Sequence, residues 1–326
     1  MQSVPPDTGS PLTPFLERNG ALILDGGLAT ELEARGYQLG DGLWSARLLH
    51  DAPQAIQQVH TDYLTAGADC VITASYQASI PGFLQHDYSE TQAVDLLRRS
   101  VELAVTARDV FWAEPDNQVG RLRPLVAASI GPYGAYLADG SEYTGHYGLS
   151  EDELVAFHRR RWQLLADTDA DLLACETIPS AVEARAFARL LKETPERFAW
   201  LSFSCGDAQH ISDGTLLADA IALFVDTPQV VALGINCTPP QYVLPLIAAV
   251  RRVTQKPVIV YPNSGEVYNA ETKQWEASPQ STDFATVSQT WRQAGAVLIG
   301  GCCRIGPSHI ETVRNRLLQR SAQKLH

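Results

Sequence analysis

The stretches Val230-Val-Ala-Leu-Gly-Ile-Asn-Cys237 and Ala296-Val-Leu-Ile-Gly-Gly-Cys-Cys303 are apolar runs that each end in cysteine. Their apolar residues stand at successive positions, so both faces of an extended chain would be apolar. Runs of this kind are typical of strands that are buried on both faces, as in parallel sheets. The two stretches therefore predict two strands of a parallel sheet, with thiols at their carboxyl ends.

Six further runs of the same type lie along the chain, with helical patterns between them. The eight predicted strands are Ala21–Asp25, Cys70–Tyr76, Leu125–Ile130, Leu172–Glu176, Ala199–Cys205, Val230–Cys237, Pro257–Tyr261 and Ala296–Cys302. Strand and helix alternating eight times indicate an α/β fold, the (β/α)8 or TIM barrel. A doubly wound open sheet is the alternative, but eight units without a break in composition favour closure.

Several helices are predicted from capping signals and from periodic apolar residues. Ser150-Glu-Asp-Glu153 is a capping box, and Pro53 suits the first turn of a helix. The predicted helical stretches are Ser150–Leu165, Pro53–Ala66, Pro179–Lys192 and Ser308–Leu318. The segment Asn263–Gln280 contains glycine, asparagine and proline breakers, so we expect it to be a loop.

Length and composition narrow the class of protein. The chain has 326 residues, 45% of them apolar, and a net charge of −12. No basic stripe is present to displace phosphate counterions, and no apolar stretch approaches the ~18 residues of a membrane span. We therefore expect neither a nucleic-acid partner nor a membrane partner.

The domain organisation and the cellular location are predicted from the composition of the N-terminal residues and from the spacing of the cysteines. Residues 1–14 are rich in proline, serine and threonine and are expected to form a flexible N-terminal tail, whereas residues 15–326 form a single barrel domain. The six cysteines are scattered, unlike the dense spacing of disulfide-stapled secreted domains. Reduced thiols in a cytoplasmic protein are the expectation.

Cys237, Cys302 and Cys303 are the candidate metal ligands, because barrel active sites lie at the carboxyl ends of the strands. Three thiolates can hold a zinc ion (Zn2+) and leave its fourth position open for catalysis. Adjacent strand residues point to opposite faces, so Cys302 and Cys303 share a metal only where Gly300-Gly301 lets the backbone turn. Three buried structural thiols, or a redox pair, are the alternatives.

Several motifs together resemble the zinc-dependent homocysteine S-methyltransferase family. They are Asp25-Gly-Gly27, Thr73-Ala-Ser-Tyr-Gln77, Gly234-Ile-Asn-Cys237, Tyr261-Pro-Asn-Ser-Gly-Glu266 and Gly300-Gly-Cys-Cys-Arg304. The resemblance runs from about Leu22 to Arg314. It implies a barrel that binds homocysteine, with zinc held by the three cysteines, and it is greatest to the short enzymes that use S-methylmethionine.

The substrate-binding residues follow from the same resemblance. Asp25 and Glu176 stand at the ends of the first and fourth predicted strands, and carboxylates are natural partners of the homocysteine ammonium group. The alternative roles are a helix N-cap for Asp25 and a structural ion pair for Glu176. Asn236 is expected to orient Cys237 or simply to close the strand.

Thr73 and a set of aromatic residues complete the expected site. Trp44 and Tyr76, with Tyr133 and Tyr136, fall near the mouth, where a cationic methyl donor could lie against aromatic faces. Packing is the alternative role for these rings. Cys70, Cys175 and Cys205 are expected to be packing residues.

The resemblance implies that a zinc-bound homocysteine thiolate takes a methyl group from S-methylmethionine, or from S-adenosylmethionine, to form methionine. Alternatives are a betaine-dependent enzyme, a selenocysteine or selenohomocysteine methyltransferase, a non-catalytic zinc- or thiol-binding barrel, and a hydrolase or lyase with Cys303 as nucleophile. The expected partners are small molecules, homocysteine and the methyl donor. We expect a monomer or a small homo-oligomer.

Overall fold

Eight parallel strands form a closed barrel in the computed structural model, which describes residues 9–39, 43, 45–265, 267–269, 274–276 and 283–318. The strand order is β1-β10-β7-β6-β5-β4-β3-β2. A parallel bridge between Leu24 and Cys70 joins the two end strands. This closure confirms the predicted TIM barrel and excludes the open sheet.

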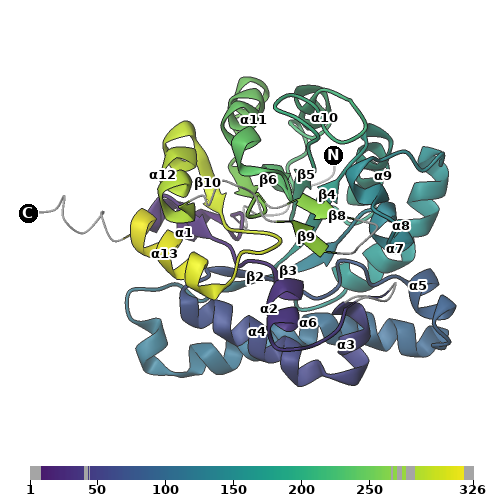
Figure 1. Ribbon diagram of the computed structural model, residues 1–326, viewed down its shortest axis with the longest axis horizontal. Coiled ribbons are helices and arrows are strands. Elements are labelled where there is room, and N and C mark those ends of the chain that lie inside the picture. The colour runs from purple at the N-terminus through teal and green to yellow at the C-terminus, as the bar shows by residue number, and fades with distance from the viewer. Residues whose placement is uncertain are drawn as a thin grey trace, which may run out of the picture.

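The strands and helices alternate along the chain, and in Figure 1 the helices surround the strands. The barrel strands are β1 (Leu22–Ile23), β2 (Cys70–Ile72), β3 (Leu125–Ile130), β4 (Leu172–Ile178), β5 (Ala199–Phe203), β6 (Val230–Asn236), β7 (Val258–Tyr261) and β10 (Ala296–Ile299). The helices are α1 (Thr13–Asn19), α2 (Leu28–Ala34), α3 (Ser45–Asp51), α4 (Pro53–Ala66), α5 (Ile80–Gln85), α6 (Glu90–Ala113), α7 (Tyr133–Leu137), α8 (Glu151–Ala166), α9 (Ala181–Leu191), α10 (Leu217–Ala222), α11 (Pro240–Val253), α12 (Phe284–Ala294) and α13 (Pro307–Leu318). Two 3-10 turns, η1 (Pro115–Gln118) and η2 (Ser141–Tyr143), lie in the connections on either side of β3.

Alternate residues of the strands contribute to two apolar cores, except where the register shifts in β6 and β10. In β3, Leu125 and Ala127 belong to the cluster inside the barrel, whereas Val126 and Ala128 belong to the cluster between strands and helices. Continuous apolar runs are therefore needed to fill both sides. Leu12 and Phe15, at the start of α1, join the inner cluster and fill the barrel at the end where the strands begin.

Several predicted strands extend too far at the mouth. The predicted strand Cys70–Tyr76 ends at Ile72, Ala199–Cys205 ends at Phe203, and Ala296–Cys302 ends at Ile299. In each case the residues beyond the ladder form the loops of the mouth. Local apolar patterning continues into these loops because they are buried as well, so the pattern alone does not mark the end of the ladder.

The expectation of a loop over Asn263–Gln280 was wrong for part of that segment. An antiparallel hairpin is formed there by β8 (Val267–Asn269) and β9 (Gln274–Glu276). Valine, tyrosine and tryptophan in these short runs favour strands. The breakers that suggested a loop lie outside the paired residues or at their ends.

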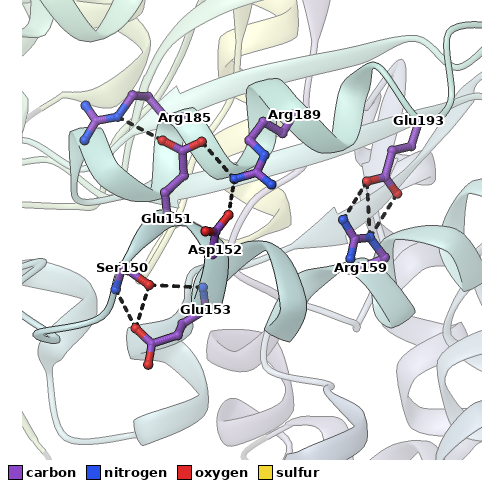
Figure 2. Close-up of polar contacts among 8 residues, drawn as sticks. All are labelled: Ser150, Glu151, Asp152, Glu153, Arg159, Arg185, Arg189 and Glu193. Atoms are coloured by element: carbon purple, nitrogen blue, oxygen red, sulfur yellow. Dashed lines mark hydrogen bonds and ion pairs between the residues drawn. The ribbon is translucent and has the colours of Figure 1, made fainter.

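The predicted capping box at the start of α8 is present, and Figure 2 shows it beside the ion pairs that link α8 to neighbouring segments. The Glu153 N–H donates to Ser150 Oγ at 3.3 Å, and the Ser150 N–H donates to Glu153 Oε2 at 2.8 Å. On the same surface Arg185 and Arg189 of α9 contact Glu151 of α8 at 3.3 and 3.2 Å. These arginines are 46% and 43% exposed, so water weakens their ion pairs.

No helix in the described part of the chain is long and apolar enough to cross a membrane. Helix α1 begins at Thr13, and residues 1–8 of the expected tail lie outside the described residues. The extent of that tail, the single domain and the cytoplasmic location stay predictions.

The capping box and the exposed ion pairs should differ in their contribution to stability. Replacing Ser150 with alanine should lower the free energy of unfolding by about 1 kcal/mol, because the Glu153 N–H in the first helical turn loses its side-chain acceptor. Arg185→Ala should cause a clearly smaller loss. Urea denaturation of both variants measures this, and equal losses would contradict the assignment of the cap.

Candidate active site

A cavity of about 120 Å³ opens at the carboxyl ends of the barrel strands. It is lined by seven of the nine predicted site residues, namely Thr73, Tyr76, Glu176, Asn236, Cys237, Cys302 and Cys303. Asp25 lies directly beside it, because its Oδ2 accepts a hydrogen bond at 2.8 Å from the N–H of Ile72, a lining residue. Trp44 lies outside the described residues.

The turn that carries Cys302 and Cys303 is held by backbone hydrogen bonds with the segments that follow β1 and β7. The Gly301 N–H donates to the Asp25 carbonyl at 3.0 Å, and the Cys302 N–H donates to the Pro262 carbonyl at 2.8 Å. The carbonyl of Cys303 accepts from the Ser264 N–H at 3.1 Å. Both cysteines thus lie beyond the regular ladder, as a shared metal site requires.

The two glycines before these cysteines are needed for close packing. A Cβ on Gly300 would lie 2.5 Å from Leu24 Cβ, and one on Gly301 would lie 2.2 Å from Ile305 Cγ2. Neither glycine has a positive φ. The expectation that they supply a special turn conformation is therefore replaced by a steric reason, since a side chain at Gly300 would clash with the end of β1 and one at Gly301 would displace Ile305.

The three predicted ligands form a compact sulfur cluster. Cys303 Sγ lies 3.7 Å from Cys237 Sγ and 4.0 Å from Cys302 Sγ, and all three sulfurs lie within 4.8 Å of one another. Cys237 and Cys302 are joined as a disulfide, contrary to the expectation of reduced thiols, whereas Cys303 is free. Once that bond is reduced, the three sulfurs form a donor set that can hold a metal ion.

The remaining cysteines lie apart from this cluster. Cys70 belongs to the core inside the barrel, and Cys175 and Cys205 belong to the core between strands and helices. None of the three lines the cavity. Burial raises the pKa of each thiol, which keeps it protonated and inert.

A bulge in β4 turns Glu176 into the cavity. The pairing of β4 with β5 shifts between Cys175 and Ile178, and Thr177 has a φ of 57°, which is unusual for a β-branched residue. Asn236 stabilises this conformation, because its Oδ1 accepts from the Thr177 N–H and its Nδ2 donates to Thr177 Oγ1, both at 2.7 Å. Asn236 therefore ties β6 to β4, in addition to preceding Cys237.

Glu176 is a buried acid without a cationic partner. It is 7% exposed and accepts a hydrogen bond from the Ser129 hydroxyl. Burial raises its pKa to about 7, against the opposing effect of the hydroxyls of Ser129 and Tyr261. No lysine, arginine or histidine is found among the described residues that line the cavity, so the structural ion pair is not formed.

Asp25 is likewise a buried acid at the edge of the cavity. It is 2% exposed, and in the described part of the chain its Oδ1 has no hydrogen-bond partner. Burial and the nearby charge of Glu176 raise its pKa well above the ordinary value. Helix α2 begins after Gly27 and has no side-chain cap, so Asp25 is not the N-cap residue considered as its alternative role.

Thr73 and Tyr76 both belong to the loop after β2. Thr73 Oγ1 accepts from the Ser129 N–H at 3.0 Å, which links this loop to β3 beneath Glu176. The Tyr76 carbonyl accepts from the Gly131 N–H at 3.2 Å and from the buried Arg161 guanidinium at 3.4 Å. These contacts fix the backbone that presents the Tyr76 ring to the cavity.

Two of the expected aromatics serve packing instead. The ring centroids of Tyr133 and Tyr136 lie 4.8 and 5.3 Å from that of Phe157 on α8. Neither residue lines the cavity.

Sequence reasoning missed Glu142 and Tyr143 of the turn η2, which both line the cavity. Glu142 is 5% exposed, and burial raises its pKa to about 7. The Tyr143 hydroxyl lies 4.0 Å from Cys237 Sγ. Their sequence signal is faint, because they stand in a polar, glycine-containing connection whose only clue is its length after the third strand.

Fold and site together define a (β/α)8-barrel protein with an acidic cavity and a three-cysteine cluster suited to a metal. A family model described as homocysteine S-methyltransferase matches residues 22–317. The chain therefore belongs to the homocysteine S-methyltransferase family.

Known relatives cover nearly the whole chain. Homocysteine S-methyltransferase YbgG of Bacillus subtilis is 52% identical over 304 residues, which are 93% of this chain and 96% of the relative. Homocysteine S-methyltransferase of Escherichia coli is 49% identical over 308 residues, or 94% and 98% of the two chains. The crystal structure of the E. coli homocysteine methyltransferase MmuM in its metallated form superposes with a TM-score of 0.84 at 47% identity, covering 94% of this chain and 99% of that one.

Removing the Glu176 charge should stabilise the protein at high pH. The pKa of this group is about 7 in the folded state against an ordinary value of 4.5, so ionisation opposes folding above pH 4.5. Glu176→Gln should therefore raise the free energy of unfolding at pH 8 by on the order of 1–3 kcal/mol. The gain should shrink as the pH falls toward 4.5.

Urea denaturation of Glu176→Gln between pH 4.5 and 8 measures this difference. Glu17→Gln is the matched control, because Glu17 lies on the exposed surface of α1. A gain that is independent of pH would contradict the proposed cost of burying the Glu176 carboxylate.

Proposed function

We propose that this protein transfers a methyl group from S-methylmethionine to the sulfur of homocysteine, forming methionine, with zinc bound by Cys237, Cys302 and Cys303. The observation that carries the proposal is the cluster of three sulfurs within 4.8 Å in a buried acidic cavity. Membership of the homocysteine S-methyltransferase family supports it. S-Adenosylmethionine is the second donor of the same chemical type.

The donor set fits zinc better than the harder metals. Three cysteine sulfurs and no carboxylate make up the described cluster, and once reduced such soft sulfur ligands select zinc over magnesium or calcium. Zinc held by three thiolates supplies an open position that favours a fourth sulfur and keeps it as thiolate, whereas a free thiol has a pKa near ~8.5. That the E. coli relative has a metallated form supports metal binding by this protein.

Asp25 and Glu176 are proposed to bind the ammonium group of homocysteine. Asp25 Oδ1 lacks a hydrogen-bond donor, and Glu176 is buried without a cation. An ammonium group supplies three N–H donors and one positive charge, so it satisfies these acceptors and favours their ionised forms. This contact orients the amino acid so that its thiol points toward the cysteine cluster.

The methyl transfer itself needs orientation and the exclusion of water. A lone pair of the homocysteine sulfur forms a bond to the methyl carbon, while the bond from that carbon to the sulfonium sulfur breaks. The electron pair stays with the leaving group, which departs as a neutral thioether. No proton has to be given to the leaving group, so the residues of the cavity act by binding and by positioning the two sulfurs in line.

Loss of one cysteine ligand should abolish both metal binding and turnover. Cys303→Ala should lose stoichiometric zinc and form no methionine from homocysteine and S-methylmethionine, because two thiolates leave the site incomplete. Zinc content after dialysis and the formation of methionine under reducing conditions measure the two effects. Cys205→Ala is the control that should keep both, and a fully active Cys303→Ala protein would refute the mechanism.

Loss of the Glu176 charge should weaken the binding of homocysteine. Glu176→Gln should raise the KM for homocysteine by about 10- to 100-fold, since a charge-assisted hydrogen bond is lost. Steady-state kinetics at saturating S-methylmethionine measure it. An unchanged KM would remove Glu176 from the proposed contact.

A further inference from the structure

Glu142 is held rigidly at the mouth of the barrel. Its carbonyl accepts from the Ser204 hydroxyl at 3.1 Å, which ties the turn η2 to the segment after β5. Gly134 packs against the same turn so closely that a Cβ there would lie 2.3 Å from the Glu142 nitrogen. The position of the Glu142 backbone is thus set by the fold.

One oxygen of the Glu142 carboxylate lacks a hydrogen-bond partner in the described structure. Glu142 lines the cavity, it is 5% exposed, and its Oε2 is buried without a hydrogen-bond donor. The charge that acts on its pKa is that of Asp139, another acid, and it raises that pKa further. Burying an acceptor and a negative charge without compensation is costly, so this place is suited to a ligand that brings N–H donors and positive charge.

Resting on the proposed function, we infer that Glu142 binds the α-ammonium group of the methyl donor. Homocysteine carries one ammonium group, and Asp25 and Glu176 at the ends of β1 and β4 are already matched to it. Glu142 comes from a different connection, between β3 and α8, in the same cavity. Glu142 is the third buried carboxylate of the cavity, and it is therefore available for the ammonium group of a second amino acid, the methyl donor.

The sulfonium of the donor is a poorer partner for Glu142 than the ammonium group. A sulfonium has no N–H, so it would leave the Oε2 acceptor unsatisfied. Its charge also disappears as the methyl group leaves, and an anion against it would stabilise the reactant more than the transition state. The ammonium charge is unchanged by the reaction, so Glu142 can bind it without raising the barrier.

This assignment makes Glu142 a determinant of donor specificity. A methyl donor that is an amino acid, such as S-methylmethionine, has an ammonium N–H that can donate a hydrogen bond to Glu142 Oε2. Betaine and simple sulfonium acids lack that donor and would bury Glu142 unpaired, which is a strong means of rejection.

The test compares two sulfonium donors that differ in the amine. In Glu142→Gln, kcat/KM for S-methylmethionine should fall by about 10- to 100-fold, while kcat/KM for dimethylsulfonioacetate, which has no amine, should be unchanged or rise. The KM for homocysteine should stay the same. Glu33→Gln is the matched control, because Glu33 is an exposed acid near Cys303 that does not line the cavity.

Calorimetric titration of S-methylmethionine into the reduced, zinc-loaded protein provides a second readout. Binding should weaken in Glu142→Gln and not in Glu33→Gln. An equal loss for both donors, a raised KM for homocysteine, or no loss at all would overturn the inference. If the wild-type protein uses neither donor, the proposed function fails, and equal calorimetric affinities of wild type and Glu142→Gln would then overturn the inference on their own.

Discussion

Eight parallel strands must place their carboxyl ends on one rim, and the whole site depends on this constraint. β6 brings Cys237, β10 leads into Cys302 and Cys303, and β4 brings Glu176. Closure through the bridge from Leu24 to Cys70 places the end of β1 beside β2. Residues that are far apart in the sequence therefore line one cavity without any local motif that joins them.

The cavity is built from acids and thiols without a compensating cation among its described lining residues. Asp25, Glu142 and Glu176 are each at least 93% buried, with exposed fractions of 2%, 5% and 7%. Their burial opposes folding and is tolerated because the rest of the barrel is well packed. Such a site suits ligands whose ammonium groups would supply the N–H donors and the positive charge that the protein leaves unsatisfied.

The site residues at the ends of the strands could be predicted from the sequence, whereas those in the connections between strands and helices could not. Apolar runs with both faces buried predict the strands, and Cys237 and Glu176 stand at their ends, so these residues were placed correctly in the cavity. Glu142 could not be predicted as a site residue, because its burial arises from contacts with Ser204 and Gly134. Ser204 is far from Glu142 in the sequence, and the contact with Gly134 has no sequence motif. The role of Asn236 in holding Thr177 likewise depends on a bulge that no local pattern reveals.

Leu12 and Phe15 fill the inner core at the opposite end of the barrel from the cavity. With that end packed, the mouth serves as the passage for arrival and for departure. Two substrates that use the same passage cannot easily move past each other. The substrate that binds deeper in the cavity therefore has to enter first, and its product has to leave last. The geometry of α1, far from any reacting atom, thus bears on the kinetic order of a two-substrate reaction.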